Sequence, residues 1–252
     1  MHIIDLSVIK ALTHAAIETK QRLRIEWISS SDLVGPDDVK SSELWKRLRS
    51  CHGIVVPGGF GSRGLEGKIS AIRYARENKV PFLGICLGMQ AAVIEYRRSV
   101  LGKINSHSAE FMEGLIEGKD DVIIFMPEGD RERMGGTMRL GARETILKEG
   151  SLVHNLYGKT HIMERHRHRY EVNPSMVDEL EAAGLYFVGR NVDADTTGDE
   201  RMEVVELNKD DHPYFVAAQF HPEFMSRPGK PSPPFLGLLK ASKLANLSTQ
   251  SS

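Results

Sequence analysis

The most constraining feature of the sequence is the segment from Val80 to Tyr96. An apolar run ends in a Gly-x-Cys-x-Gly turn around Cys86, and good helix formers follow from Met89. This order predicts a strand, a sharp turn and a helix, the arrangement called a nucleophile elbow. The turn presents the sulfur at the carboxyl end of a strand, where the first amides of the helix favour its thiolate form. The segment therefore predicts a nucleophilic cysteine in an α/β fold.

Predicted strands and helices alternate along the rest of the chain. Strands are expected at 23–28, 53–57, 80–85, 122–126, 185–190, 202–207 and 215–219, and helices at 7–20, 43–49, 65–78, 89–96, 175–183 and 235–246. Alternation at this spacing favours a mostly parallel sheet with helices on both faces. The less regular middle, with a turn and short strand at 135–141, is expected to add a small antiparallel β portion.

Composition excludes several classes of protein. The chain has 252 residues, 40% of them hydrophobic, and a net charge of −1, so neither nucleic acid nor an anionic membrane is an expected partner. No apolar stretch reaches the length of a membrane span, and the first residues lack the features of a signal peptide. Two cysteines in unlike contexts, Cys51 and Cys86, argue against a disulfide scaffold. We therefore expect a cytoplasmic protein.

Two further motifs follow predicted strands. His221 and Glu223 come directly after the strand at 215–219, and Gly59 lies in a glycine-rich turn after the strand at 53–57. The carboxyl ends of parallel strands share one edge of a sheet, so both motifs can meet Cys86 there. A histidine that moves the thiol proton and a carboxylate that orients it complete a nucleophilic triad. The amides of Gly59 and Leu87 would form an oxyanion hole.

Each motif alone has a plainer interpretation. A single buried cysteine is usually a small hydrophobe, which is our interpretation of Cys51. The basic segment 165–169 is compatible with a solvated loop, an anion site, or zinc bound by His166 and His168 with His161 or His154. Nucleic-acid binding is disfavoured because aromatic residues are not interleaved with the basic ones. Glu110 is compatible with a surface acid or with a carboxylate that pairs a substrate ammonium.

The motifs together resemble the triad-type class I glutamine amidotransferases, and most of all the glutaminase domains of CTP synthases. The matching stretches are 57–61, 64–67, 75–78, 82–90, 134–141, 164–173, 219–223 and 226–234. They cover nearly the whole chain, and the segments 135–141 and 165–173 are the most specific. The resemblance implies a flavodoxin-like fold, with one glutaminase domain at 1–247 and a disordered tail at 248–252.

The resemblance also implies a role for each matching residue. Cys86 would attack the side-chain amide of L-glutamine, and His221, oriented by Glu223, would act as general base and acid. Glu110 would bind the ammonium of glutamine and Arg169 its carboxylate. The full set of implied glutamine-binding residues is Gly59, Phe60, Leu87, Gly88, Met89, Gln90, Glu110, Arg169 and Tyr170. The family implies neither a metal nor a cofactor in this domain.

Partners are implied by the resemblance as well. In CTP synthases the ammonia passes to an N-terminal synthetase domain, which uses ATP and magnesium to aminate UTP, and the enzyme is a homo-tetramer. GTP is the allosteric activator, and Phe60 would offer its base a stacking face. This chain holds no synthetase sequence and only Met1 to Asp5 where the family has its first strand. We therefore expect a glutaminase domain alone, with its first strand shortened or missing and with low turnover.

Two alternatives remain at this point. One is another γ-glutamyl hydrolase or peptidase of the same superfamily, in which we would not expect both Glu110 and Arg169 to be needed. The other is a non-catalytic domain that binds GTP for regulation. A glutamine-analogue diazoketone separates the second alternative from an enzyme, since only an enzyme would be alkylated at Cys86.

Overall fold

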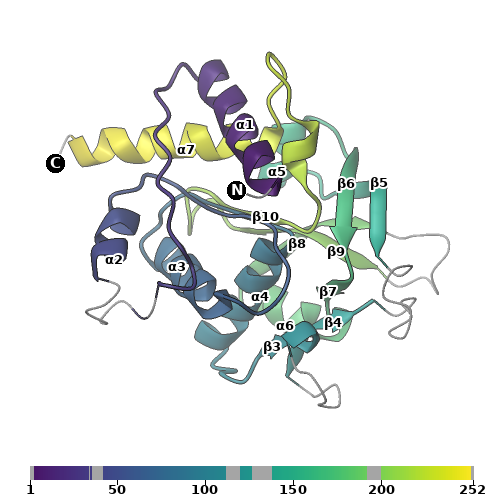
Figure 1. Ribbon diagram of the computed structural model, residues 1–252. Coiled ribbons are helices and arrows are strands. Elements are labelled where there is room, and N and C mark those ends of the chain that lie inside the picture. Colours follow the sequence, from purple (N-terminus) through teal and green to yellow (C-terminus); the bar gives the residue numbers. More distant parts are fainter. Residues whose placement is uncertain are drawn as a thin grey trace.

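The computed structural model describes residues 3–33, 35, 42–111, 120–126, 138–191 and 200–250 (Figure 1). The helices are α1 (Ile3–Glu18), α2 (Ser42–Arg49), α3 (Leu65–Glu77), α4 (Leu87–Ser99), α5 (Leu152–Tyr157), α6 (Val177–Ala182) and α7 (Pro233–Gln250). The strands are β1 (Ile54–Val56), β2 (Phe82–Ile85), β3 (His107–Ser108), β4 (Asp121–Phe125), β5 (Arg139–Leu147), β6 (His161–His168), β7 (Tyr170–Val172), β8 (Leu185–Asn191), β9 (Arg201–Leu207) and β10 (Phe215–Ala218). Three short 3-10 helices, η2 (Ala109–Phe111), η3 (Pro174–Met176) and η4 (Pro222–Met225), complete the described elements.

A seven-stranded sheet in the order β1-β2-β10-β9-β8-β5-β6 forms the centre of the molecule. Strand β2 pairs in parallel with β1 and with β10, whereas the remaining four pairings described in this sheet are antiparallel. The α/β class and the antiparallel portion are confirmed. The sheet is mixed, however, and its antiparallel part is larger than predicted, because β5, β6, β8 and β9 join it through antiparallel pairings.

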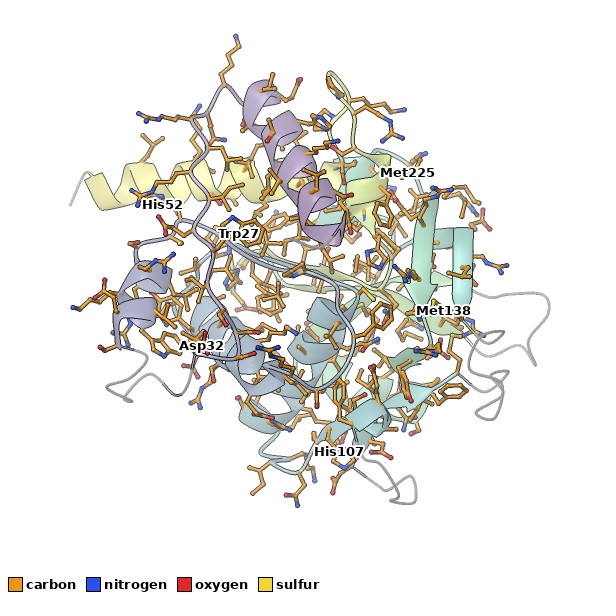
Figure 2. The ribbon with its side chains drawn as sticks, in the orientation of Figure 1. Trp27, Asp32, His52, His107, Met138 and Met225 are labelled. Carbon is orange, nitrogen blue, oxygen red and sulfur yellow. The ribbon has the colours of Figure 1, made fainter. Side chains whose placement is uncertain are left out.

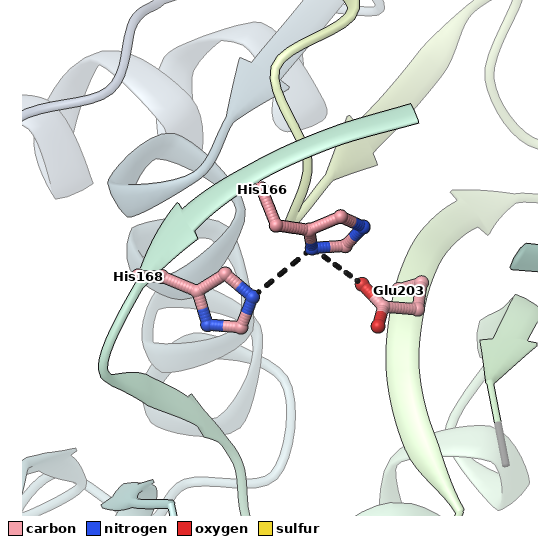
Figure 3. Close-up of side chains that lie close together, drawn as sticks. All are labelled: His166, His168 and Glu203. Atoms are coloured by element: carbon pink, nitrogen blue, oxygen red, sulfur yellow. Dashed lines mark hydrogen bonds and ion pairs between the residues drawn. The ribbon is translucent and has the colours of Figure 1, made fainter. Parts of the chain in front are cut away.

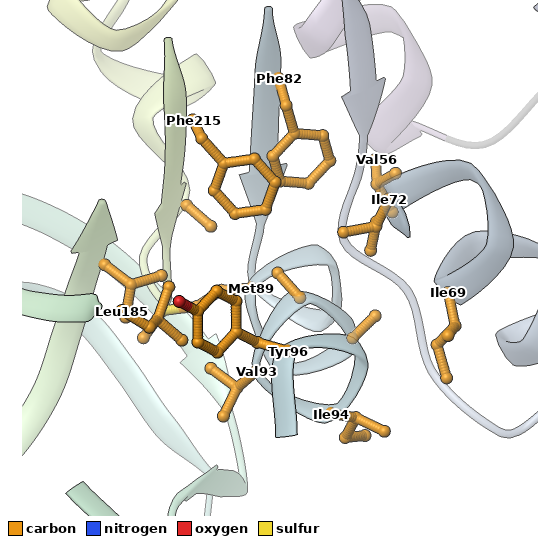
Figure 4. Packing of buried hydrophobic residues seen from close by; sticks show 14 of the residues in the cluster. Val56, Ile69, Ile72, Phe82, Met89, Val93, Ile94, Tyr96, Leu185 and Phe215 are labelled. Carbon is orange, nitrogen blue, oxygen red and sulfur yellow. The ribbon is translucent and has the colours of Figure 1, made fainter. Parts of the chain in front are cut away.

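Helices cover both faces of the parallel part, as expected (Figure 1). The period-2 alternation of the strands assigns successive side chains to opposite faces. Phe82 and Phe215 pack with α3 and α4 in one buried cluster, their ring centroids 4.6 Å apart (Figure 4). Leu83 and Val216 pack on the other face with α1 and α7. Strands β2 and β10 are therefore buried on both faces, which fixes the carboxyl edge where the site lies.

A second, three-stranded sheet has the order β3-β4-β7. Strand β4 pairs in parallel with β3 and antiparallel with β7. Only Arg169 separates β6 from β7, so the long ribbon of the main sheet continues directly into this small sheet. The junction brings the basic segment next to the elbow.

Several predicted elements differ from the observed ones. Residues 23–28 form no strand: Leu23 and Ile25 are half-buried, but no ladder joins the segment to another described residue, and Trp27 is 54% exposed (Figure 2). The basic segment is the end of strand β6 instead of a loop, and α5 was not predicted. Helix α7 continues through Ser248 to Gln250, where the tail was expected to begin. The predicted turn at 135–137 lies outside the described residues.

None of the helices in the described part of the chain combines the length and apolar character needed to cross a membrane.

Candidate active site

Cys86 occupies the turn between β2 and α4 in a backbone conformation that side chains rarely adopt, with φ 52° and ψ −106°. The two flanking glycines are required by close contacts. A Cβ on Gly88 would collide with the carbonyl oxygen of Val56, and one on Gly84 would lie 2.8 Å from the Cβ of Ala217. The predicted elbow is thus present, with Cys86 buried at the start of α4.

The histidine and the acid lie beyond the carboxyl end of β10, as predicted. His221 Nδ1 is 2.8 Å from Glu223 Oε1, and both residues are almost fully buried. The backbone N–H of His221 donates to the carbonyl of Arg165 on β6, and its ring stacks on Phe224 with centroids 5.2 Å apart. Edge strand β6 therefore helps to fix the position of the imidazole.

His221 also lies against the elbow. A Cβ on Gly58 would be 2.8 Å from His221 Cε1 and 3.4 Å from Cys86 Cβ, so that glycine sits at the junction of the two. Burial is the largest single influence on the pKa of His221 and lowers it. The hydrogen bonds and negative charges of Cys86 and Glu223 together outweigh burial and raise the pKa to about 10. With this raised pKa, His221 holds its proton at neutral pH.

A pocket opens beside the sulfur. Its lining combines residues from the β1 loop, α4, η2 and the β6–β7 junction: Gly59, Phe60, Cys86, Gln90, Glu110, His168, Arg169 and Tyr170. Six of the predicted glutamine-binding residues are among them. The other three, Leu87, Gly88 and Met89, form the first turn of α4 and are buried.

The pocket holds one acid and one guanidinium. Glu110 accepts from the backbone N–H of Gly61 at 3.3 Å. Burial raises the pKa of Glu110, while that amide, Arg169 and Lys68 lower it. Burial likewise lowers the pKa of Lys68, against the attraction of Glu110. Opposite charges in one pocket suit a zwitterionic amino acid.

The predicted oxyanion amides lie next to one another. A Cβ on Gly59 would be 3.5 Å from the Cδ2 atom of Leu87, which places the glycine loop against the first residue of α4. The assignment of these two amides to an oxyanion stays a prediction.

The sequence interpretation missed three residues that contact the site. Gln219 donates through Nε2 to Cys86 Sγ at 3.7 Å, and its Oε1 accepts from Gln90 Nε2 at 3.2 Å. His168 lines the pocket, and the guanidinium of Arg167 lies 5.3 Å from the centre of the Phe60 ring. Gln219 lies two residues before His221 of the recognised His-Pro-Glu motif, but no local pattern shows that it reaches Cys86.

Of the four histidines considered for zinc, His154 lies on α5, and the other three are divided between the two faces of β6. His161 is exposed and lies 3.0 Å from Glu144, whereas His166 and His168 face inward. Together with Glu203 on β9, these two form the group with metal-ligand chemistry among the described residues (Figure 3). Neither His161 nor His154 belongs to it.

Comparisons with known proteins identify the family of this chain. The family model for class-I glutamine amidotransferases matches residues 2–241. The CTP synthase of Eremothecium gossypii is 52% identical over 244 residues, and CTP synthase 1-A of Xenopus laevis 54% over 242, each covering 94% of this chain. The chain spans 41% and 39% of those two proteins.

A solved structure is similar as well. The glutaminase domain of the Trypanosoma brucei CTP synthase, with bound acivicin, is 39% identical with a TM-score of 0.83. The match covers 94% of this chain and 87% of that one. This similarity confirms the flavodoxin-like fold expected from the sequence. With the family model spanning nearly every residue, the chain belongs to the class-I glutamine amidotransferase family.

Proposed function

We propose that this chain hydrolyses the side-chain amide of L-glutamine to glutamate and ammonia. The observation that carries the proposal is one pocket that holds the Cys86 thiol, the Glu110 carboxylate and the Arg169 guanidinium. Glu110 would bind the α-ammonium and Arg169 the α-carboxylate, which leaves the amide carbon to meet the sulfur. The γ-glutamyl residue of a γ-glutamyl peptide also has both α ends free, so these two charges fit either substrate and do not discriminate as expected from the sequence. The CTP synthase relatives favour glutamine.

The first half of the reaction would use the charged pair of Cys86 and His221. The thiolate adds to the amide carbon, and the oxygen takes the negative charge facing the amides of Gly59 and Leu87. His221, whose pKa near 10 keeps its proton at neutral pH, gives that proton to the departing nitrogen. Ammonia leaves and a γ-glutamyl thioester remains on Cys86.

The second half needs His221 as a base. Two of the influences that raise its pKa come from Cys86, through a hydrogen bond and a negative charge. Both are lost when the sulfur is acylated, so the pKa of His221 falls once the thioester forms. The neutral imidazole, still oriented by Glu223, then takes a proton from water as the water attacks the thioester.

We further propose that the chain is the glutaminase part of a CTP synthase. The named relatives support this, and the ammonia would then pass to a synthetase domain that uses ATP and magnesium to aminate UTP. A homo-tetramer and a cytoplasmic location belong to the same proposal. The two free cysteines, Cys51 and Cys86, suit a reducing compartment.

GTP is the proposed activator of this reaction. The ring of Phe60 is 48% exposed at the rim of the pocket and offers a base a stacking surface. Arg167, beside that ring, would pair with a phosphate.

Release of glutamate and ammonia from L-glutamine tests the proposal, measured with and without GTP. The wild-type chain should form the two products in equal amounts, and a Cys86→Ala chain should form neither. Products released at the wild-type rate by the alanine variant would contradict it. A chain that binds GTP but releases no ammonia under any condition would favour the regulatory alternative.

A further inference from the structure

The inward face of β6 carries a buried polar cluster that the proposed reaction does not use. His166 Nδ1 lies 3.1 Å from His168 Nε2 and 3.5 Å from Glu203 Oε2 (Figure 3). All three residues are at most 3% exposed. The cluster extends to the pocket, because His168 is one of the pocket-lining residues.

The hydrogen-bond partners assign the ring protons of both histidines. His168 Nδ1 is 3.1 Å from the carbonyl oxygen of Tyr170, which can only accept, so Nδ1 carries the proton. Burial, with Arg139 next, lowers the pKa of His168 to about 3, so its ring is neutral and its Nε2 is an acceptor. His166 Nδ1 must then be the donor to that nitrogen.

The same carbonyl connects this cluster to the nucleophile. Tyr170 O also accepts from Gln90 Nε2 at 2.9 Å. Gln90 donates to Gln219 at 3.2 Å, and Gln219 reaches Cys86 Sγ at 3.7 Å. A continuous series of polar contacts thus runs from β9 through the substrate pocket to the sulfur.

A bound cation explains the cluster less well. The guanidinium of Arg139 is 3.2 Å from Glu203 Oε1, and its positive charge would repel a metal ion beside that carboxylate. A metal would also require the facing nitrogens of both rings to be unprotonated. The observed 3.1 Å between those nitrogens is a normal hydrogen-bond distance.

We propose that His166 and His168 are positioning residues, with protons fixed on Nδ1 of each ring, and that they hold the Arg169–Tyr170 backbone in the geometry that binds glutamine. This inference rests on the proposed function. Neither histidine touches the reacting atoms. Each acts through the carbonyl of Tyr170, which the donor at His168 Nδ1 holds in place.

A matched pair of variants separates this role from general packing. Asparagine at 168 retains a donor near the position of Nδ1, whereas glutamine places its amide near Nε2 and loses that donor. We expect acivicin to alkylate Cys86 in His168→Gln about tenfold more slowly than in His168→Asn, the effect of one lost hydrogen bond. Iodoacetamide, which needs no amino-acid site, should alkylate both variants at similar rates.

The outcomes are distinguishable by mass spectrometry of the full chain. His161→Gln, on the exposed face of the same strand, serves as the control and should label like wild type. If wild type itself is not alkylated by acivicin, the proposed function fails. If wild type is alkylated but the two variants at 168 label equally, the positioning role is overturned.

Histidine nitrogen NMR of the wild-type chain keeps the inference testable should both variants misfold. We expect His166 and His168 to show the Nδ1–H tautomer. An Nε2–H tautomer at His168 would overturn the inference. So would stoichiometric zinc binding that is lost in His166→Gln, because the metal would displace the Nδ1 proton of His166.

Discussion

The side chain of Glu223 supplies both a hydrogen bond and a charge to His221. Glu223→Gln retains an oxygen that can accept from Nδ1 but removes the charge. The pKa of His221 should fall, and the rate of glutamine hydrolysis should drop by about 10²-fold, within the range for general acid–base catalysis. An NMR titration of the imidazole and a steady-state assay measure the two effects. An unchanged pKa of His221 would contradict our account of the pair.

Glu164 is a second buried carboxyl near this pair. Burial has the largest influence on the pKa of Glu164 and raises it. The hydrogen bond from Tyr157 lowers the pKa and the negative charge of Glu223 raises it, and the resulting pKa is about 7. The folded chain therefore binds a proton at Glu164 more tightly than the unfolded chain does. Its contribution to stability is full below about pH 4.5, where both forms are protonated, and is lost as the pH rises to about 7.

The difference in stability between wild type and Glu164→Gln isolates this effect from other titrating groups. Between about pH 4.5 and about pH 7, the free energy of unfolding of wild type should fall by up to about 3 kcal/mol relative to that of the variant. Urea denaturation at a series of pH values measures it. Glu144→Gln, an exposed acid on neighbouring strand β5, is the control. If the free energies of unfolding of wild type and Glu164→Gln, plotted against pH, stayed parallel throughout, a raised pKa of Glu164 would be disproved.

Among the elements, the closest approach at the site is between β1 and α4. A methyl group on Gly88 would meet the carbonyl oxygen of Val56, so the helix must move away from the strand. Gly88→Ala should lower the free energy of unfolding by about 1–3 kcal/mol and slow the alkylation of Cys86. Gly35→Ala is the control, because a Cβ there would meet nothing within 4 Å. Equal urea midpoints for the two variants would refute the close contact.

Helices α3 and α4 are also joined by a buried ion pair. Arg76 donates to both oxygens of Glu95, at 2.9 and 2.8 Å, and the Glu95 side chain is fully buried. Arg76→Met leaves that carboxylate without its guanidinium and should lower the free energy of unfolding by about 3–5 kcal/mol.

The matched control for that pair lies on the surface of α3. Arg73 is 2.8 Å from Glu77, but both side chains are largely exposed. Arg73→Met should therefore cost less than about 1 kcal/mol. Urea denaturation measures both variants. If Arg76→Met and Arg73→Met lost similar free energies of unfolding, burial would not explain the larger effect expected for Arg76→Met.

At the scale of the whole molecule, sequence reasoning succeeded where the signal is local. The elbow around Cys86 and the His-Pro-Glu motif are each encoded in a few adjacent residues, and the strands on which they depend are apolar enough to recognise. The edge of a parallel sheet then brings them together without further information. The same reasoning located most of the pocket through the family resemblance.

The remaining features depend on contacts between distant segments. The basic residues of 165–169 resemble a loop in sequence, yet pairing with β5 makes them an edge strand whose alternation buries His166 and His168. Segment 23–28 has strand-like alternation, but no strand in the described part of the chain pairs with it. Gln219 reaches the sulfur only because β10 lies beside β2. None of these pairings is visible in a single local pattern.

The central claim is that Cys86 is the nucleophile in a glutamine pocket. Its most direct test is peptide mass spectrometry of the full chain, quenched in acid during incubation with L-glutamine. We predict a γ-glutamyl adduct on the peptide that contains Cys86, with Cys51 unmodified. Glutamate formed without any adduct on Cys86, or an adduct on Cys51 instead, would contradict the account.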